Sequence, residues 1–133
     1  MLAQGGILYH VYGDNAGWHV GNTGIPVGSE ISAVHMGGIV PQVMSVENGV
    51  LYQIWGDTSG WHKASTGVPA RGTISAVNMG GSWPQVILSE NYNLYQIFGT
   101  TSGWMKWGLG VPGSPSISAV NMGGGWPQIL KVG

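Results

Sequence analysis

Residues 41–61 read PQVMSVENGVLYQIWGDTSGW and hold the signals that decide the fold. An apolar run leads into the pair Asn48-Gly49, and a second run rich in β-branched and aromatic residues follows it. Asn-Gly is a strong hairpin signal because both residues tolerate positive φ, and β-branched and aromatic side chains suit a pleated strand. Residues 56–60, with two glycines and an aspartate, indicate a second turn before Trp61. The segment therefore predicts two consecutive β-hairpins.

The same pattern recurs along the whole chain with a period of 43 residues and no insertion. Such a period indicates a repeat architecture built from one supersecondary unit. We place the units at about 6–48, 49–91 and 92–133, within one domain that spans residues 1–133. The equivalent positions include Leu8, Leu51 and Leu94; Trp18, Trp61 and Trp104; and Pro41, Pro84 and Pro127.

Each unit is expected to hold four short strands. In the middle of the chain these are residues 42–46, 50–55, 61–65 and 74–79, with a Pro/Gly loop at 66–73 and a break at Gly80-Gly81. Gly and Pro interrupt the chain too often for a helix. The sequence therefore predicts an all-β fold.

Four meandering strands per unit are typical of a β-propeller blade. Three blades do not close a ring, and an open ring leaves unpaired strand edges. We therefore expect the C-terminal strand of one chain to pair with the N-terminal strand of a second, which gives a six-bladed ring from a homodimer. A β-trefoil, which also holds three repeats and closes as a monomer, is the alternative; the tight two-hairpin meander favours the propeller.

Composition excludes several classes of function. Only 7% of the residues are charged and the net charge is −1, whereas binding to nucleic acid needs clustered cations. The longest apolar runs are too short to cross a membrane. The first six residues lack the features of a signal peptide, so we expect a protein that is cytoplasmic or released without one. There is no Cys, and therefore no disulfide or thiolate metal site.

Residues 41–61 resemble a blade of the fucose-binding six-bladed propeller lectins. The resemblance lies in a strand, an Asn-Gly hairpin, a second strand ending in Trp, a short Asp/Gly turn and Gly-Trp, and it covers all three units. It implies a sugar-binding function and a ring that short chains assemble together. The sugar in those lectins is held by an Arg on the first strand and a Glu on the second. This chain carries Gln42, Gln85 and Gln128 at the first position and His10, Gln53 and Gln96 at the second.

Aromatic and amide residues that recur at fixed repeat positions are the candidate sugar-binding residues. A Trp face can stack on a pyranose ring, and Gln both donates and accepts hydrogen bonds to hydroxyl groups. The alternative is that the tryptophans pack between units and the glutamines make structural hydrogen bonds. The candidates are Trp18, Trp61, Trp104, Trp83, Trp126, Gln42, Gln85, Gln128, Gln53, Gln96 and His10.

Neither a metal site nor a catalytic site is expected. His10, His19, His35 and His62 lack metal-binding spacing. The five carboxylates fall at repeat-equivalent or scattered positions, whereas hydrolysis needs carboxylates or a nucleophile and base close together. We therefore expect a multivalent carbohydrate-binding lectin that needs no cofactor and whose partners are glycans. The alternative is a structural or assembly module that mediates protein contacts.

Overall fold

The protein is all-β. The computed structural model describes residues 1–132, and these contain thirteen strands and no helix. The strands form four antiparallel sheets, which we number in chain order. The first sheet holds β1 (Leu2–Gln4), β2 (Ile7–Asp14) and β3 (Gly17–Pro26); the second holds β4 (Glu30–Val34), β5 (Gln42–Glu47), β6 (Val50–Asp57) and β7 (Gly60–Pro69). The third holds β8 (Thr73–Val77), β9 (Gln85–Glu90), β10 (Asn93–Thr100) and β11 (Gly103–Pro112); the fourth holds β12 (Ile117–Val120) and β13 (Gln128–Lys131).

The second and third sheets are complete four-stranded meanders whose strands lie in chain order. Their four strand positions repeat with the sequence period, so that β4, β8 and β12 occupy the first position. By the same spacing, β1, β2 and β3 occupy the second, third and fourth positions of the first sheet, and β13 the second position of the fourth sheet.

One strand assignment made from the sequence is wrong. The strand expected at residues 74–79 pairs with β9, with Val77 opposite Gln85, and is therefore the first strand of the third sheet rather than the fourth of the second. Gly80-Gly81 lies in the connection between β8 and β9, inside one sheet. The complete sheets thus span residues 30–69 and 73–112, and their ends differ from those of the sequence units.

The loop expected at residues 66–73 is also largely wrong, because β7 continues to Pro69. The pairing of β6 with β7 shifts register between Val50 and Tyr52, which marks a bulge. Gly67 in this bulge has a φ of 74°, and the Thr66 hydroxyl donates to the Leu51 carbonyl at 2.7 Å. The glycine therefore bends the strand without ending it.

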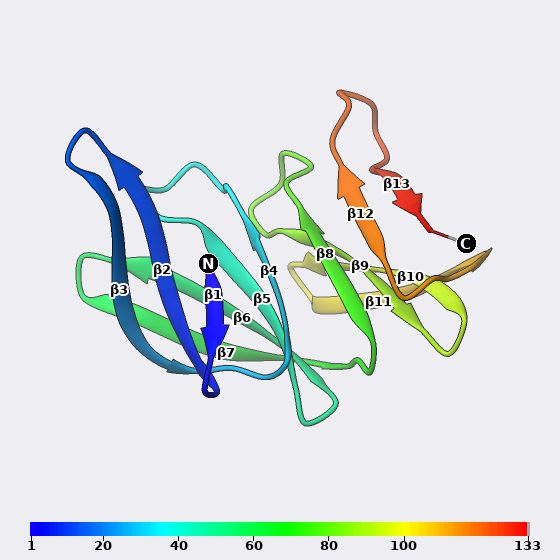
Figure 1. Ribbon diagram of the computed structural model, residues 1–133. Helices are drawn as coiled ribbons and strands as arrows, with labels where there is room; N and C mark the ends of the chain where they lie inside the picture. The colour runs from blue at the N-terminus through cyan, green and yellow to red at the C-terminus, as the bar shows by residue number, and fades with distance from the viewer. Residues whose placement is uncertain (133) are drawn as a thin grey trace.

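The four sheets follow one another side by side in chain order, with β1–β3 at one end and β12–β13 at the other (Figure 1). The first-position strands β4, β8 and β12 contact one another in sequence. No strand pairing joins one sheet to the next within residues 1–132, and no closed barrel is formed. A β-trefoil requires such a barrel, so the arrangement does not support that alternative.

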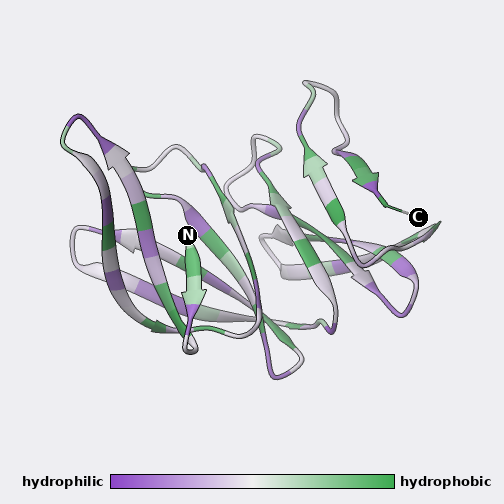
Figure 2. Ribbon diagram, in the orientation of Figure 1, coloured by the Kyte–Doolittle hydropathy of each residue, from purple (hydrophilic) through white to green (hydrophobic). Residues whose placement is uncertain are grey.

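The hydrophobic core lies between the sheets. One cluster joins the second and third sheets and another joins the first and second, and hydrophobic residues recur along the strands between them (Figure 2). The adjacent residues Val43 and Met44 of β5 are both fully buried but belong to different clusters, because successive side chains of a strand point to opposite faces of the sheet. The fully buried members include Met44, Leu51, Ile97 and Leu88 in the first cluster and Leu8, Val43 and Ile54 in the second.

The Asn-Gly hairpin is confirmed, because Asn48 and Gly49 have φ values of 52° and 76°. The equivalent turn of the third sheet holds Asn91 and Tyr92, at 50° and 63°. A left-handed conformation costs a non-glycine residue about 1–2 kcal/mol. Tyr92 is 89% exposed, so little packing compensates this cost.

Replacing Tyr92 by Gly should therefore raise the free energy of unfolding by about 1 kcal/mol. Denaturant unfolding of the two proteins measures the difference. Tyr92→Ala, which removes the ring but keeps a Cβ, should give a much smaller gain. Equal gains from the two variants would show that the ring, and not the backbone conformation, is the source of the strain.

Within residues 1–132 there is no helix of the length and apolar character needed to cross a membrane.

Candidate functional site

Three of the predicted site residues meet where the second sheet faces the third. They line a cavity of about 300 Å³, which we call the amide notch. This volume lies at the lower end of the range of small-molecule sites, about 300–1,000 Å³. The notch is lined by Gln42, Gln53, Trp55, Ser82 and Trp83.

A pair of amide side chains forms one wall of the notch. The Gln53 side-chain nitrogen donates to the side-chain oxygen of Gln42 at 2.9 Å. The third sheet repeats the pair, with Gln96 donating to Gln85 at 2.7 Å. Each amide has both donors and an acceptor, so one bond leaves the Gln42 amino group and the Gln53 oxygen available to a ligand. The bond between the two amides therefore holds both side chains in place, and it leaves one donor and one acceptor facing the notch.

Two indole rings lie beside these amides. Trp55 lines the notch from β6 and stacks on His62, with ring centroids 5.5 Å apart. Trp83, from the loop before β9, is 37% exposed and lies against Gly99. A Cβ at Gly99 would come within 2.9 Å of the Trp83 ring. The missing side chain at residue 99 therefore lets the ring lie flat on the third sheet.

The three repeat-equivalent tryptophans Trp18, Trp61 and Trp104 lie between sheets or on an open face. Trp61 and Trp104 pack against the two core clusters, and the Trp61 ring meets His10 edge-on at 5.8 Å. Trp18 lies on the outer face of the first sheet, against which no other sheet of residues 1–132 packs, and it is 80% exposed. The surroundings of Trp61 and Trp104 therefore agree with the alternative that these tryptophans pack between units.

The remaining predicted site residues lie in the two end sheets. His10 lies between Tyr12 and Trp61, with ring centroids 4.9 and 5.8 Å away. Gln128 is exposed on β13, at the end of the chain opposite from His10. Trp126 holds the repeat position of Trp83 and is 73% exposed.

Sequence reasoning missed Trp55 and Ser82. Trp55 follows Gln53 by two residues on one strand, and residues two apart share a face of a sheet, so alternation was enough to find it. Ser82 lies in the irregular β8–β9 connection, where periodicity gives no signal.

A Ser, His and Asp cluster occupies the exposed turn between β6 and β7. The Ser59 hydroxyl donates to Asp57 Oδ1 at 2.6 Å, and His62 Nε2 lies 3.0 Å from the same oxygen. A hydrolytic triad places its nucleophile and its carboxylate on different nitrogens of the His ring. Here the serine proton is directed to the carboxylate, and both groups contact Nε2. The cluster therefore stabilises a turn.

The hydrogen bond from the Ser59 hydroxyl, aided by His62 and the Ser59 N–H, lowers the pKa of Asp57 from 3.8 to about 2. A lowered pKa means that ionised Asp57 stabilises the fold above about pH 4, and that this contribution is lost as the pH falls towards 2. In an NMR titration, the Asp57 carboxyl should titrate near pH 2, and Ser59→Ala should move the midpoint towards 3.8. A midpoint near 3.8 in the unchanged protein would contradict the hydrogen-bonded turn.

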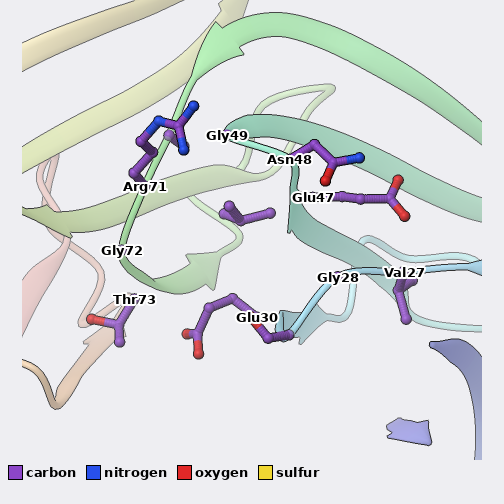
Figure 3. Close-up of a pocket in the computed structure, with 12 residues that line it drawn as sticks. Val27, Gly28, Glu30, Glu47, Asn48, Gly49, Arg71, Gly72 and Thr73 are labelled. Atoms are coloured by element: carbon purple, nitrogen blue, oxygen red, sulfur yellow. The ribbon is translucent and has the colours of Figure 1, made fainter. Parts of the chain in front are cut away.

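The largest cavity, of about 710 Å³, lies at the opposite ends of the strands from the amide notch, beside the Asn48-Gly49 hairpin. Figure 3 shows that its charged side chains, Glu30, Glu47 and Arg71, point in different directions instead of converging. The Glu47 carboxylate is held by Lys63 at 2.6 Å. This cavity lacks the convergent polar groups of a binding site.

No three His, Cys, Asp or Glu side chains are grouped as metal ligands within the described part of the chain, residues 1–132. Comparison with protein-family models, curated proteins and solved structures finds no match for this sequence or its fold.

Proposed function

We propose that the protein is a multivalent lectin whose sugar sites are the notches between neighbouring sheets, and that each sheet is a blade of a propeller. The observation that carries the proposal is the amide notch, in which the bonded pair Gln42–Gln53 lies beside the indoles of Trp55 and Trp83. Two copies of the chain close a six-bladed ring and thereby multiply the sites.

The chemistry of the notch matches that of a neutral sugar. Hydroxyl groups need donors and acceptors, which the Gln42 amino group and the Gln53 oxygen supply. The C–H face of a pyranose needs an aromatic surface, which Trp83 supplies. The nearly uncharged chain fits a neutral ligand, because a neutral sugar has no charge to steer toward the protein.

A single notch would bind weakly, because it offers few hydrogen bonds and one exposed indole. Linking several weak sites raises the apparent affinity for a multivalent surface by about 10²–10⁴. The proposed use is therefore attachment to surfaces that display many copies of one glycan, without catalysis.

The alternative is a structural or assembly module that mediates protein contacts. This alternative is supported by amide side chains that connect neighbouring sheets. The Asn78 side chain donates to the His35 carbonyl, and the Asn121 side chain donates to the Asn78 carbonyl, each at 2.9 Å. Such bonds serve assembly and need no ligand.

Binding to a panel of immobilised glycans, with competition by free monosaccharide, tests the proposal. A lectin should bind a defined subset of the panel, and millimolar concentrations of the matching free sugar should displace it. Binding to no glycan, or binding that free sugar leaves unchanged, would favour the assembly module.

A further inference from the structure

The first and fourth sheets are complementary fragments of one complete sheet. Within residues 1–132, the first sheet has no first-position strand, and the fourth has no third or fourth strand. Their registers match those of the complete sheets: Ala3 lies opposite Leu8 as Val46 lies opposite Leu51, and Val120 lies opposite Gln128. β1 pairs only with residues 7–9 of β2, so β13 of another copy would pair with the next part of that strand. By the spacing of the repeat, Ile129 and Leu130 would lie opposite Val11 and His10, as Val86 and Ile87 lie opposite Ile97 and Gln96.

Apolar side chains are exposed on the two faces that such a pairing would cover. On the first sheet, Trp18 is 80% and Val20 65% exposed. On the third sheet, Met105 is 41% and Trp107 52% exposed. Within the chain, the corresponding fourth strands β7 and β11 contact each other. The face with Trp107 would meet the face with Trp18 and Val20 in the same way.

Two departures from the repeat fall on these same two faces. Lys63 and Lys106 tie their sheets to the preceding one by donating to the carbonyls of Pro26 and Pro69, at 2.7 and 2.9 Å. The first sheet has Val20 at that position. The position of Trp107 is held by Gly21 and Ala64 in the other two fourth strands, β3 and β7. An apolar residue thus replaces a cation on one face, and a tryptophan replaces a small residue on the other.

Hydrogen bonds also connect the first-position strands in series, and the two ends of this series carry a matching donor and acceptor. The Ala76 N–H donates to the Ser32 hydroxyl at 2.8 Å, and the Ala119 N–H to the Ser75 hydroxyl at 2.9 Å. Ala33 holds the repeat position of the donor at the start of the chain, and Ser118 that of the acceptor at its end. A second copy would continue the series by joining Ala33 to Ser118.

We infer that the face around Trp18 and Val20 and the face around Trp107 are the two halves of a seam between two copies of this chain. The inference rests on the proposed ring, and it assigns the residues that hold the ring together. The four complete sheets of the pair, with the two that the partial sheets form together, give six, within the range of about four to eight blades seen in propellers. Charge is nearly absent from the seam, so its specificity comes from the fit of Trp107 against Val20.

The seam also completes binding notches that one chain lacks. Gln128 of one copy would meet His10 of the other at the positions of Gln42 and Gln53. One more notch therefore has both positions of its amide pair filled at each seam, with one residue from each copy.

Mass in solution, measured for the whole chain by light scattering, tests the seam. The unchanged protein should have twice the mass of the 13.9 kDa chain. Val20→Glu alone and Trp107→Lys alone should each weaken the dimer by about 100-fold or more, because buried tryptophans contribute most at interfaces. Tyr92→Glu, which places a charge at an exposed aromatic on a hairpin outside the seam, should stay dimeric.

Mixing the two seam variants supplies the decisive result. In a mixed pair, one seam has its original residues and the other brings the two introduced side chains, a carboxylate and an ammonium, together. The mass should therefore return to that of a dimer, and rescue also shows that both variants are folded. An unchanged protein of 13.9 kDa, as expected if another chain covers the open faces, would overturn the inference. So would seam variants that remain dimeric, or a mixture that stays monomeric.

The same variants separate the seam from the lectin proposal. The amide notch lies inside one chain, so monomeric Val20→Glu should still bind the glycan at that notch. Dimer loss with glycan binding retained supports both proposals. A dimer that forms as described but binds no glycan supports the seam and contradicts the lectin.

Discussion

Replacing Lys106 by Met should lower the free energy of unfolding by about 2–3 kcal/mol. The Lys106 ammonium donates to Glu90 at 2.9 Å and to the Pro69 carbonyl at 2.9 Å, and it lies 4.7 Å from the centre of the Tyr95 ring. The two charged side chains are only 21% and 14% exposed. Methionine keeps most of the unbranched apolar part of the side chain, but it leaves the partly buried Glu90 carboxylate without its cation.

The first sheet provides a matched control for this prediction. At the positions of Lys106 and Glu90 it carries Val20 and Gln4, an uncharged pair. The double variant Lys106→Val, Glu90→Gln copies that pair, so it should recover part of the stability lost in the single variant. Urea unfolding of the three proteins measures both differences. A single variant within about 0.5 kcal/mol of the unchanged protein would show that this ion pair behaves as an exposed one.

The double variant Trp83→Val, Trp126→Val should weaken glycan binding by about 30-fold, which corresponds to about 2 kcal/mol for an aromatic surface that no longer covers the sugar. Valine already holds this repeat position as Val40, so the substitution should be compatible with the fold. Isothermal titration with the glycan selected from the panel measures the change. An unchanged affinity would remove both indoles from the site.

Gly99→Val tests the position of the Trp83 ring without removing it. A side chain at residue 99 would collide with the ring, since even a Cβ would come within 2.9 Å of it. The ring must then leave the surface of the third sheet, and binding at the amide notch should weaken as in the Trp83 variant. Gly81→Val, at a loop glycine whose Cβ would meet nothing within 4 Å, is the control. It should bind normally.

The sequence predicted the fold class and the hairpins because these depend on local signals. The 43-residue period and the Asn48-Gly49 turn are visible without knowledge of any contact. The sheet to which residues 73–77 belong was not predictable in this way. Alternation shows that a segment is a strand, but it does not show which neighbour the strand pairs with, and the glycines at 80–81 suggested a break that the structure lacks.

The candidate site was predicted in its residue types but not in its assembly. Repetition indicated Gln42, Gln53 and Trp83 separately. Their meeting depends on the register of β5 and β6, which allows the amide–amide bond, and on the packing of two sheets against each other. Neither follows from spacing alone. Repetition also does not show whether a residue packs in the core or faces a ligand. Trp61 and Trp104 were selected because they recur, and they lie against the core clusters.

A neutral sugar is expected to bind between the second and third sheets. Two-dimensional NMR of the labelled protein during addition of the selected glycan tests it most directly. We expect the glycan to shift two sets of signals, the side-chain amides of Gln42 and Gln53 and the indole N–H groups of Trp55 and Trp83. Shifts confined to Asn48 and Arg71, at the larger cavity, would contradict it.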